Sequence, residues 1–208
     1  MKIIAHRGMW QVPEEKNTIN AFKRALEHGF GIETDFRDQN HRLVISHDLP
    51  DQDSLDADVF FDLCNQYKNA YPHAINVKSD GLQMLLKQHL KQWSSEHYFI
   101  FDMSIPDTLG YLRAQLNTFT RVSEYETFQD FRGKTHGIWV DGFESEWYSS
   151  ELLRGYLLAG QSIAIVSPEL HGRNHQSLWA MIKAIDTPDG RLMLCTDLPL
   201  EARKYFDE

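Results

Sequence analysis

The sequence predicts an α/β protein built on a parallel sheet, and three observations favour this fold class. Short β-prone runs alternate with longer segments of helical periodicity, which is typical of repeated βα units. The β-prone runs are apolar along almost their whole length, as expected for strands covered on both faces. Eight such runs occur, and eight strands close a TIM (β/α)8 barrel. We therefore expect a compact TIM barrel, with a doubly wound open sheet as the alternative.

Most of the expected strands finish on a hydrogen-bonding or ionisable side chain. They lie at residues 2–5, 31–36, 74–78, 98–103, 120–124, 137–141, 162–167 and 191–196. No Gly-rich phosphate-binding fingerprint follows the first of them, which disfavours the open doubly wound sheet.

The segment at residues 18–29 shows the expected helical pattern clearly. Phe22 and Leu26 lie four residues apart on one face, Thr18 is a capping residue type at the start, and Gly29 is a typical stop. Residues 126–131 are expected to form little more than a turn. Similar apolar spacing predicts helices within residues 81–93, 107–116, 149–160 and 175–185.

A further extended run at residues 43–48 follows the second expected strand after a short polar turn. We expect a hairpin-like excursion around residues 38–48 that brings His47 back to the edge where this strand ends. No internal repeat, linker or low-complexity tract divides the chain, so residues 1–208 are expected to form one domain.

The composition limits the classes of partner. Of the 208 residues, 42% are hydrophobic and 25% are charged, and the formal net charge is −9. This balance disfavours nucleic-acid binding but is compatible with a local basic pocket for a phosphate-bearing small molecule. The two cysteines lack metal-type spacing, and no signal-like or membrane-spanning run is recognised. We expect a cytoplasmic protein without stable membrane association, and the sequence does not predict its oligomeric state.

In a (β/α)8 barrel, catalytic groups lie at the rim formed by the carboxyl ends of the strands. Glu33 and Asp35 are two residues apart in an expected strand, so their carboxylates point to the same face. A hard divalent ion such as Ca2+ or Mg2+ would relieve their mutual repulsion. The alternative is a structural pair that Arg37, Lys78 or a hydrogen-bond network neutralises.

Two histidines, His6 and His47, each end an apolar run and precede a charged residue. Taken singly, either is more often structural. Two histidines on opposite sides of a substrate, however, can divide acid and base roles near neutral pH. Arg7 and Lys78 add positive charge suited to phosphate oxygens.

Four motifs, in order, resemble the glycerophosphodiester phosphodiesterase family, which belongs to the phospholipase-C-like phosphodiesterases and has a TIM-barrel fold. The motifs are His-Arg-Gly at 6–8, Asn-Thr at 17–18 with Ala-Phe at 21–22, Gly-Ile-Glu-Thr-Asp at 31–35 and His-Asp at 47–48. The resemblance is strong over residues 1–50 and continues weakly through residues 75–78.

The resemblance implies metal-assisted hydrolysis of a phosphodiester. In such enzymes a neighbouring hydroxyl attacks phosphorus, one histidine takes its proton, the other protonates the leaving alcohol, and water then opens the cyclic phosphate. The family's catalytic histidines correspond to His6 and His47, its acidic metal ligands to Glu33 and Asp35, and its phosphate-binding cations to Arg7 and Lys78.

Departures from the family pattern concern the metal and the substrate. Asn76 stands where the family has a third acidic ligand, so we expect it to bind the ion more weakly through its carbonyl oxygen, with Asp102 compensating. Lys16 replaces an acidic residue of the Asn-Thr motif. Residues 167–173 replace a late aromatic motif, and we expect two residues of this segment to bind a different substrate, namely His171 and Arg173.

Together these features predict a metal-dependent enzyme that hydrolyses a glycerophosphodiester or a related alcohol, sugar or lipid-headgroup phosphodiester. The alternative from another class is a non-catalytic phosphate- or sugar-binding barrel that has lost its metal through Asn76. The presence of both histidines and both carboxylates favours the enzyme, because binding alone does not need an acid–base pair. A barrel whose rim residues only satisfy one another is the third interpretation.

Overall fold

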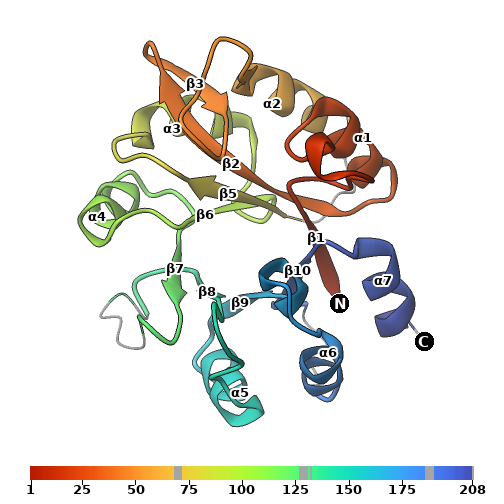
Figure 1. Ribbon diagram of the computed structural model, residues 1–208. Coiled ribbons are helices and arrows are strands. Elements are labelled where there is room, and N and C mark those ends of the chain that lie inside the picture. Colours follow the sequence, from red (N-terminus) through yellow and green to blue (C-terminus); the bar gives the residue numbers. More distant parts are fainter. Residues whose placement is uncertain (68–71, 127–130, 132, 186–189, 208) are drawn as a thin grey trace. The chain divides into compact units, whose positions relative to one another are not determined.

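The computed structural model describes residues 1–67, 72–126, 131, 133–185 and 190–207. The chain divides into two compact units: an N-terminal unit of residues 4–118, and a C-terminal unit of residues 119–208 with residues 1–3. Their relative positions are not determined, so each is described by itself (Figure 1). The expectation of one domain stays a prediction, and the turn expected at residues 126–131 lies mostly outside the described residues.

The N-terminal unit is a parallel sheet with an antiparallel extension. Its strands are β1 (Lys2–His6), β2 (Gly31–Gln39), β3 (Arg42–Ile45), β4 (Leu55–Asp56), β5 (His73–Val77) and β6 (Tyr98–Phe101). β2 pairs in parallel with β1 and with β5, and β5 pairs in parallel with β6. β3 pairs antiparallel with the last residues of β2, and β4 pairs antiparallel with β3.

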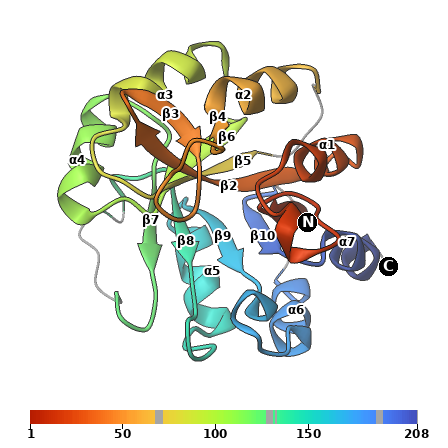
Figure 2. The same cartoon turned by 45° about the horizontal axis from the view of Figure 1, so that its top comes forward.

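The helices of this unit are η1 (Pro13–Glu15), α1 (Ile19–Glu27), α2 (Ala57–Asn65), α3 (Gln83–His89), η2 (Leu90–Gln92) and α4 (Ile105–Arg113). α1 begins as predicted, because Thr18 Oγ1 accepts a hydrogen bond from the N–H of Ala21. α2 was not among the expected helices, although Asp56 caps it. α1 packs against β2 and α2 (Figure 2).

The predicted hairpin around residues 38–48 is confirmed. Gln39 pairs with Arg42, and the two turn residues, Asn40 and His41, both have left-handed φ values of 50° and 64°. Two such residues give the tight turn whose twist matches the flanking strands. After β3, the N–H of Ser46 donates to the carbonyl oxygen of Asp35 at 3.0 Å, so the chain returns to the end of β2.

The C-terminal unit is a second parallel sheet with helices. Its elements are β7 (Phe119–Val122), β8 (Gly137–Val140), α5 (Ser150–Leu158), β9 (Ser162–Val166), η3 (Pro168–His171), α6 (Gln176–Lys183), β10 (Leu192–Thr196) and α7 (Pro199–Asp207). β7 to β10 pair in sequence order, and α5 packs against β9 (Figure 2). Every expected strand overlaps an observed one, and α7 adds a helix that the periodicity did not predict.

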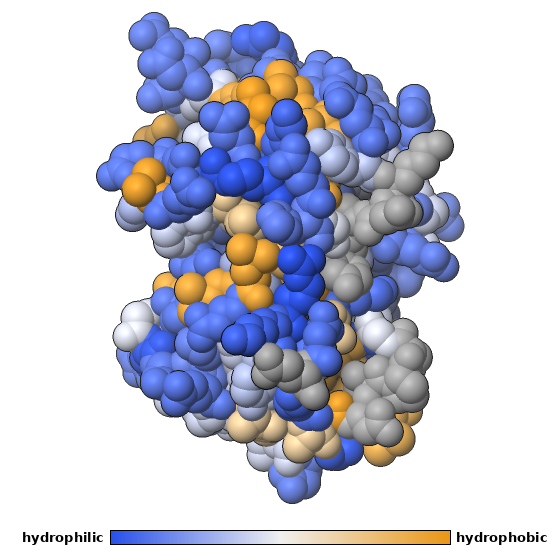
Figure 3. All heavy atoms as spheres, turned by 90° about the vertical axis from the view of Figure 1, so that its right-hand side faces the viewer, coloured by the Kyte–Doolittle hydropathy of each residue, from blue (hydrophilic) through white to orange (hydrophobic). Residues whose placement is uncertain are grey.

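The surface agrees with the acidic composition of the chain. Hydrophilic residues predominate on the face shown in Figure 3, where the hydrophobic residues form separate small patches. Among the described residues, none of the helices has the length and apolar character needed to cross a membrane.

His73, at the start of β5, is built into the fold in its neutral form. Its Nδ1 accepts a hydrogen bond from the N–H of Ile32 at 3.1 Å, and its ring centroid lies 5.8 Å from that of Phe60 and 5.3 Å from that of Trp93. Burial, with a smaller contribution from the charge of His97, lowers the pKa of His73 to about 3.

We expect the free energy of unfolding to decrease as the pH falls below about 6.5, because unfolded His73 then binds a proton that folded His73 does not. For one such histidine the slope is about 1.4 kcal/mol per pH unit. Urea denaturation between about pH 7 and pH 5 measures it. The variant His73→Gln keeps an acceptor for Ile32 and should lose most of this slope; an unchanged slope would assign it to other groups.

Candidate active site

The carboxyl ends of three neighbouring strands bring most of the predicted site residues together in the N-terminal unit. In the parallel register, His6 of β1 lies opposite Glu33 of β2, and Asp35 of β2 lies opposite Asn76 of β5. Because residues two apart on a strand share a face, Glu33 and Asp35 point the same way. The sequence spacing therefore becomes one cluster of polar side chains at the end of the sheet.

Asp35 is a buried carboxylate that two cations neutralise. Its side chain is 0% exposed, its Oδ2 lies 3.1 Å from Arg7 Nε, and its Oδ1 lies 3.6 Å from Lys78 Nζ. The side-chain amide of Asn17 also donates to Oδ2 at 2.9 Å. A fully buried charge needs such partners. Asp35 therefore fixes Arg7 and Lys78 next to each other.

Glu33 is equally buried but has weaker compensation. Its Oε1 accepts a hydrogen bond from Asn76 Nδ2 at 2.9 Å, and its Oε2 lies 3.9 Å from His6 Nε2 and 3.3 Å from the main-chain nitrogen of Arg7. Burial and then the negative charge of Asp35 raise the pKa of Glu33, and the attractions of His6, Asn76 and Arg7 offset this only in part. A further cation at this carboxylate would be stabilising.

Lys78 also binds Asp102, which the sequence assigned as a compensating metal ligand. Lys78 Nζ lies 3.0 Å from Asp102 Oδ2, so in this structure the carboxylate of Asp102 holds the lysine. Its role as a metal ligand stays a prediction.

Three residues of this cluster have left-handed backbone conformations: Arg7, Asn17 and Asp102, with φ of 56°, 60° and 72°. Such residues cost roughly 1–3 kcal/mol each and gather at functional sites. Asn17 was not among the predicted site residues. Its N–H donates to the carbonyl of Arg7 at 3.0 Å, and its Oδ1 accepts from Thr34 Oγ1 at 2.8 Å. Its place in the Asn-Thr motif was the signal that could have found it.

His47 follows β3 directly after the contact between Ser46 and Asp35. Its side chain is 45% exposed, and its Nδ1 lies 2.9 Å from Asp48 Oδ1. Its carbonyl oxygen accepts hydrogen bonds from the guanidinium of Arg37, at 3.2 Å from both Nε and one terminal nitrogen. A carboxylate at Nδ1 favours a proton on that nitrogen, which leaves Nε2 available for proton transfer.

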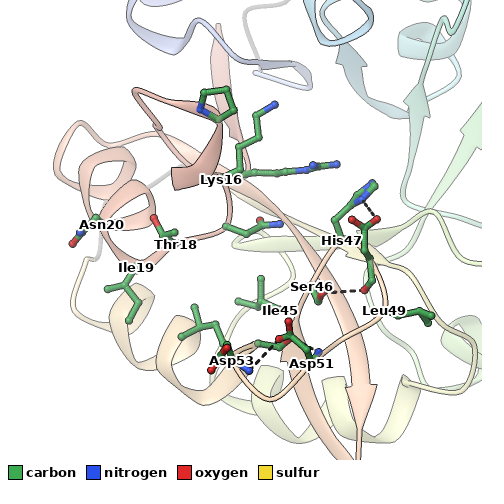
Figure 4. A pocket seen from close by; sticks show the side chains of 16 residues that line it. Lys16, Thr18, Ile19, Asn20, Ile45, Ser46, His47, Leu49, Asp51 and Asp53 are labelled. Atoms are coloured by element: carbon green, nitrogen blue, oxygen red, sulfur yellow. Dashed lines mark hydrogen bonds and ion pairs between the residues drawn. The ribbon is translucent and has the colours of Figure 1, made fainter.

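Arg7 and His47 line the same pocket, which has a volume of about 820 Å3. Figure 4 shows Lys16 on one side of this pocket, His47 on another, and Asp51 and Asp53 at the opposite end from Lys16. The size falls within the range of small-molecule sites. The pocket thus joins one predicted catalytic histidine to one predicted phosphate-binding cation.

The oxygen atoms of the cluster fit a hard divalent cation. Buried Asn76 Oδ1 and Asp35 Oδ1 accept no hydrogen bond from the described residues, and Glu33 supplies a second carboxylate. Carboxylate and amide oxygens are the ligands that Ca2+ and Mg2+ prefer. The described part of the chain contains no metal-type group of three or more His, Cys, Asp or Glu residues, because the third oxygen here belongs to an amide.

The C-terminal unit holds the two predicted substrate-binding residues that remain. His171, at the end of η3, has its Nε2 2.8 Å from Asp141 Oδ1, and its ring packs edge-on against Phe143 with centroids 5.4 Å apart. The guanidinium of Arg173 donates to the carbonyl oxygen of Gly142. Both are held at the loops that follow β8 and β9, and their substrate roles stay predictions.

Comparison with solved structures decides the fold class. A glycerophosphodiester phosphodiesterase from Parabacteroides distasonis matches with a TM-score of 0.77 and 16% identity, over 99% of this chain and 96% of that one. A putative glycerophosphodiester phosphodiesterase from Galdieria sulphuraria matches with a TM-score of 0.78 and 14% identity, over 100% and 98%. The chain has a TIM-barrel fold.

The expected fold class is thereby confirmed, and the doubly wound open sheet is excluded. A Ca2+-dependent phosphatidylinositol-specific phospholipase C from Streptomyces antibioticus also matches this TIM barrel, with a TM-score of 0.59 and 11% identity over 99% of this chain and 95% of that one. The structural likeness to phosphodiesterases extends over the whole chain, whereas the sequence motifs cover its first quarter. No protein-family model and no curated protein matches the sequence.

Proposed function

We propose that the protein is a metal-dependent phosphodiesterase that hydrolyses a glycerophosphodiester or a related alcohol or sugar phosphodiester. One observation carries this proposal: a pocket lined by Arg7 and His47 opens beside two buried carboxylates, Glu33 and Asp35. A purely structural rim does not need two histidines, paired acids and cations on converging strands. The substrate is a small molecule, and the proposal includes a single cytoplasmic domain that binds neither nucleic acid nor a membrane stably.

Arg7 and Lys78 hold the phosphodiester in this proposal. Both are already oriented by Asp35, and Lys78 is also held by Asp102 at 3.0 Å. Cations fixed before the substrate arrives stabilise charge on phosphoryl oxygens without reorganising during the reaction. His171 and Arg173 of the C-terminal unit contact the rest of the substrate.

His6 and His47 transfer the protons. One takes the proton of a substrate hydroxyl next to the phosphodiester as its oxygen attacks phosphorus, and the other donates a proton to the alcohol oxygen that leaves. The product of this step is a cyclic phosphate and a free alcohol. Water then adds to phosphorus with the two histidines in exchanged roles, which gives a phosphate monoester. Asp48 positions His47 through its Nδ1.

The divalent cation is held by Glu33, Asp35 and Asn76, and Asp102 is its compensating ligand. When bound, Ca2+ or Mg2+ supplies positive charge to the phosphoryl oxygens. With an amide in the set, the site has less negative charge than three carboxylates would give, so its affinity for the ion is modest.

The variant Asn76→Asp should increase metal affinity and make the fold depend on the metal. A third carboxylate beside Glu33 adds repulsion, since Asn76 Nδ2 now lies 2.9 Å from Glu33 Oε1. Without metal we expect the free energy of unfolding to decrease by about 1–3 kcal/mol, and saturating Mg2+ to restore it. Calorimetric titration and thermal melting measure both effects. An unchanged affinity for Mg2+ would remove Asn76 from the ligand set.

The proposed function is tested by following a glycerophosphodiester with 31P NMR in the presence of Mg2+ or Ca2+. We expect the diester signal to decrease while a cyclic phosphate appears transiently and a monoester accumulates. The competing function, a non-catalytic phosphate-binding barrel, is favoured by the amide of Asn76 in place of an acid. Phosphate binding without turnover of any diester in a panel would support it and contradict the enzyme.

A further inference from the structure

The pocket in front of Arg7 and His47 has more room than a phosphodiester and glycerol require. At about 820 Å3 it lies near the upper end of ordinary small-molecule sites. Lys16, a third basic residue, lines the same pocket but comes from a different segment, the end of η1. A cation in this position has no role in the proton transfers proposed above.

Lys16 is held in place by contacts to the segment that carries His6. Its Nζ lies 4.5 Å from the ring centroid of Trp10, a cation–π geometry. The indole N–H of Trp10 in turn donates to the carbonyl oxygen of His6 at 3.2 Å. The main-chain nitrogen of Lys16 donates to Pro13 at 3.2 Å. The ammonium group is thus oriented before any ligand binds.

The pocket is polarised along its length. Lys16 lies at one end in Figure 4, and Asp51 and Asp53 lie at the other. Asp51 Oδ1 accepts hydrogen bonds from the N–H of Asp53 at 3.0 Å and from Ser54 Oγ at 3.2 Å, which fixes this acidic end locally. A negatively charged group on a ligand is therefore favoured near Lys16 and disfavoured near the aspartates.

We propose that Lys16 determines specificity by binding a second anionic group, a carboxylate or a phosphate monoester, on the alcohol portion of the substrate. The reacting phosphodiester lies between Arg7 and His47, and this assignment rests on the proposed function. The preferred substrate is thus a diester whose alcohol carries an additional negative charge near the reacting phosphorus.

Hydrolysis of three matched p-nitrophenyl phosphodiesters tests this proposal. Their second alcohols are glycerol, which is neutral, glyceric acid, which carries a carboxylate, and glycerol monophosphate, which carries a second phosphate. In Lys16→Gln we expect kcat/KM to fall about tenfold, mainly through KM, on one or both anionic diesters. The neutral diester should change less than about twofold. The anionic diester with the larger loss identifies the group that Lys16 binds. Equal losses on all three diesters, or none, would overturn the proposal.

A binding measurement separates this inference from the proposed function. Glycerol 3-phosphate and 3-phosphoglycerate differ by a carboxylate, and we expect wild type to bind the second about tenfold more tightly. Lys16→Gln should remove this ratio and Lys16→Arg should keep it. Lys23→Gln, a change on α1 where Lys23 pairs with Glu27 at 3.9 Å, is the matched control. A ratio that survives in Lys16→Gln contradicts the inference, whereas binding without diester hydrolysis contradicts only the proposed function.

Discussion

The variant Asp35→Asn should lose about a thousandfold or more in kcat/KM and about 3–5 kcal/mol in free energy of unfolding. Asp35 is 0% exposed and contacts Arg7, Lys78 and Asn17. Removal of its charge leaves two cations crowded together without their shared anion and removes one oxygen of the metal site. Urea denaturation and diester hydrolysis measure the two losses.

Asp58→Asn is the matched control for this variant. Asp58 also pairs with a basic side chain, His89 Nδ1 at 3.1 Å, but it is 72% exposed. Exposed pairs contribute less than about 1 kcal/mol, so this control should keep both stability and activity. Wild-type stability in Asp35→Asn would show that the cluster does not depend on this carboxylate.

The variant His47→Gln should lose activity by about 100- to 10,000-fold while keeping its stability, because the side chain is half exposed and follows the end of a strand. Rates measured against pH should lose one limb of the wild-type profile. His136→Gln, at an exposed position of the C-terminal unit, is the control.

The leaving group distinguishes the two proton-transfer roles of His47. p-Nitrophenolate leaves without a proton, whereas a natural alcohol needs one. If His47 protonates the leaving alcohol, the loss in His47→Gln is much smaller for the p-nitrophenyl diester than for the natural one; equal losses make His47 the base. Full activity on both substrates would contradict any catalytic role for His47.

The sequence predicted the strands well because parallel strands covered by helices are nearly continuous apolar runs. It predicted helices less completely. In α2 the buried residues Ala57, Phe60, Phe61 and Cys64 have helical spacing after a capping Asp56, so the signal was present but not used. In α7, only Pro199 and Ala202 are buried, so the periodicity is weak. The hairpin was predictable because its polar turn separates two apolar runs.

The site was predicted where short motifs fix residues to strand ends. Register alone then places His6 beside Glu33 and Asp35 beside Asn76. Contacts formed by irregular segments were not predictable in this way. The hydrogen bond from Asn17 to Asp35 and the ion pair from Lys78 to Asp102 depend on left-handed residues in loops, Asn17 and Asp102, which no periodicity marks.

The most direct test of a metal-assisted centre at Glu33 and Asp35 is diester hydrolysis as a function of Mg2+ or Ca2+ concentration after treatment with a chelator. We predict that wild type has almost no activity without metal and recovers it saturably, while Glu33→Gln stays inactive at every concentration. Glu27→Gln, at a half-exposed position on α1, should behave as wild type. Full activity of the chelated protein, or metal-dependent activity of wild-type size in Glu33→Gln, would contradict this account.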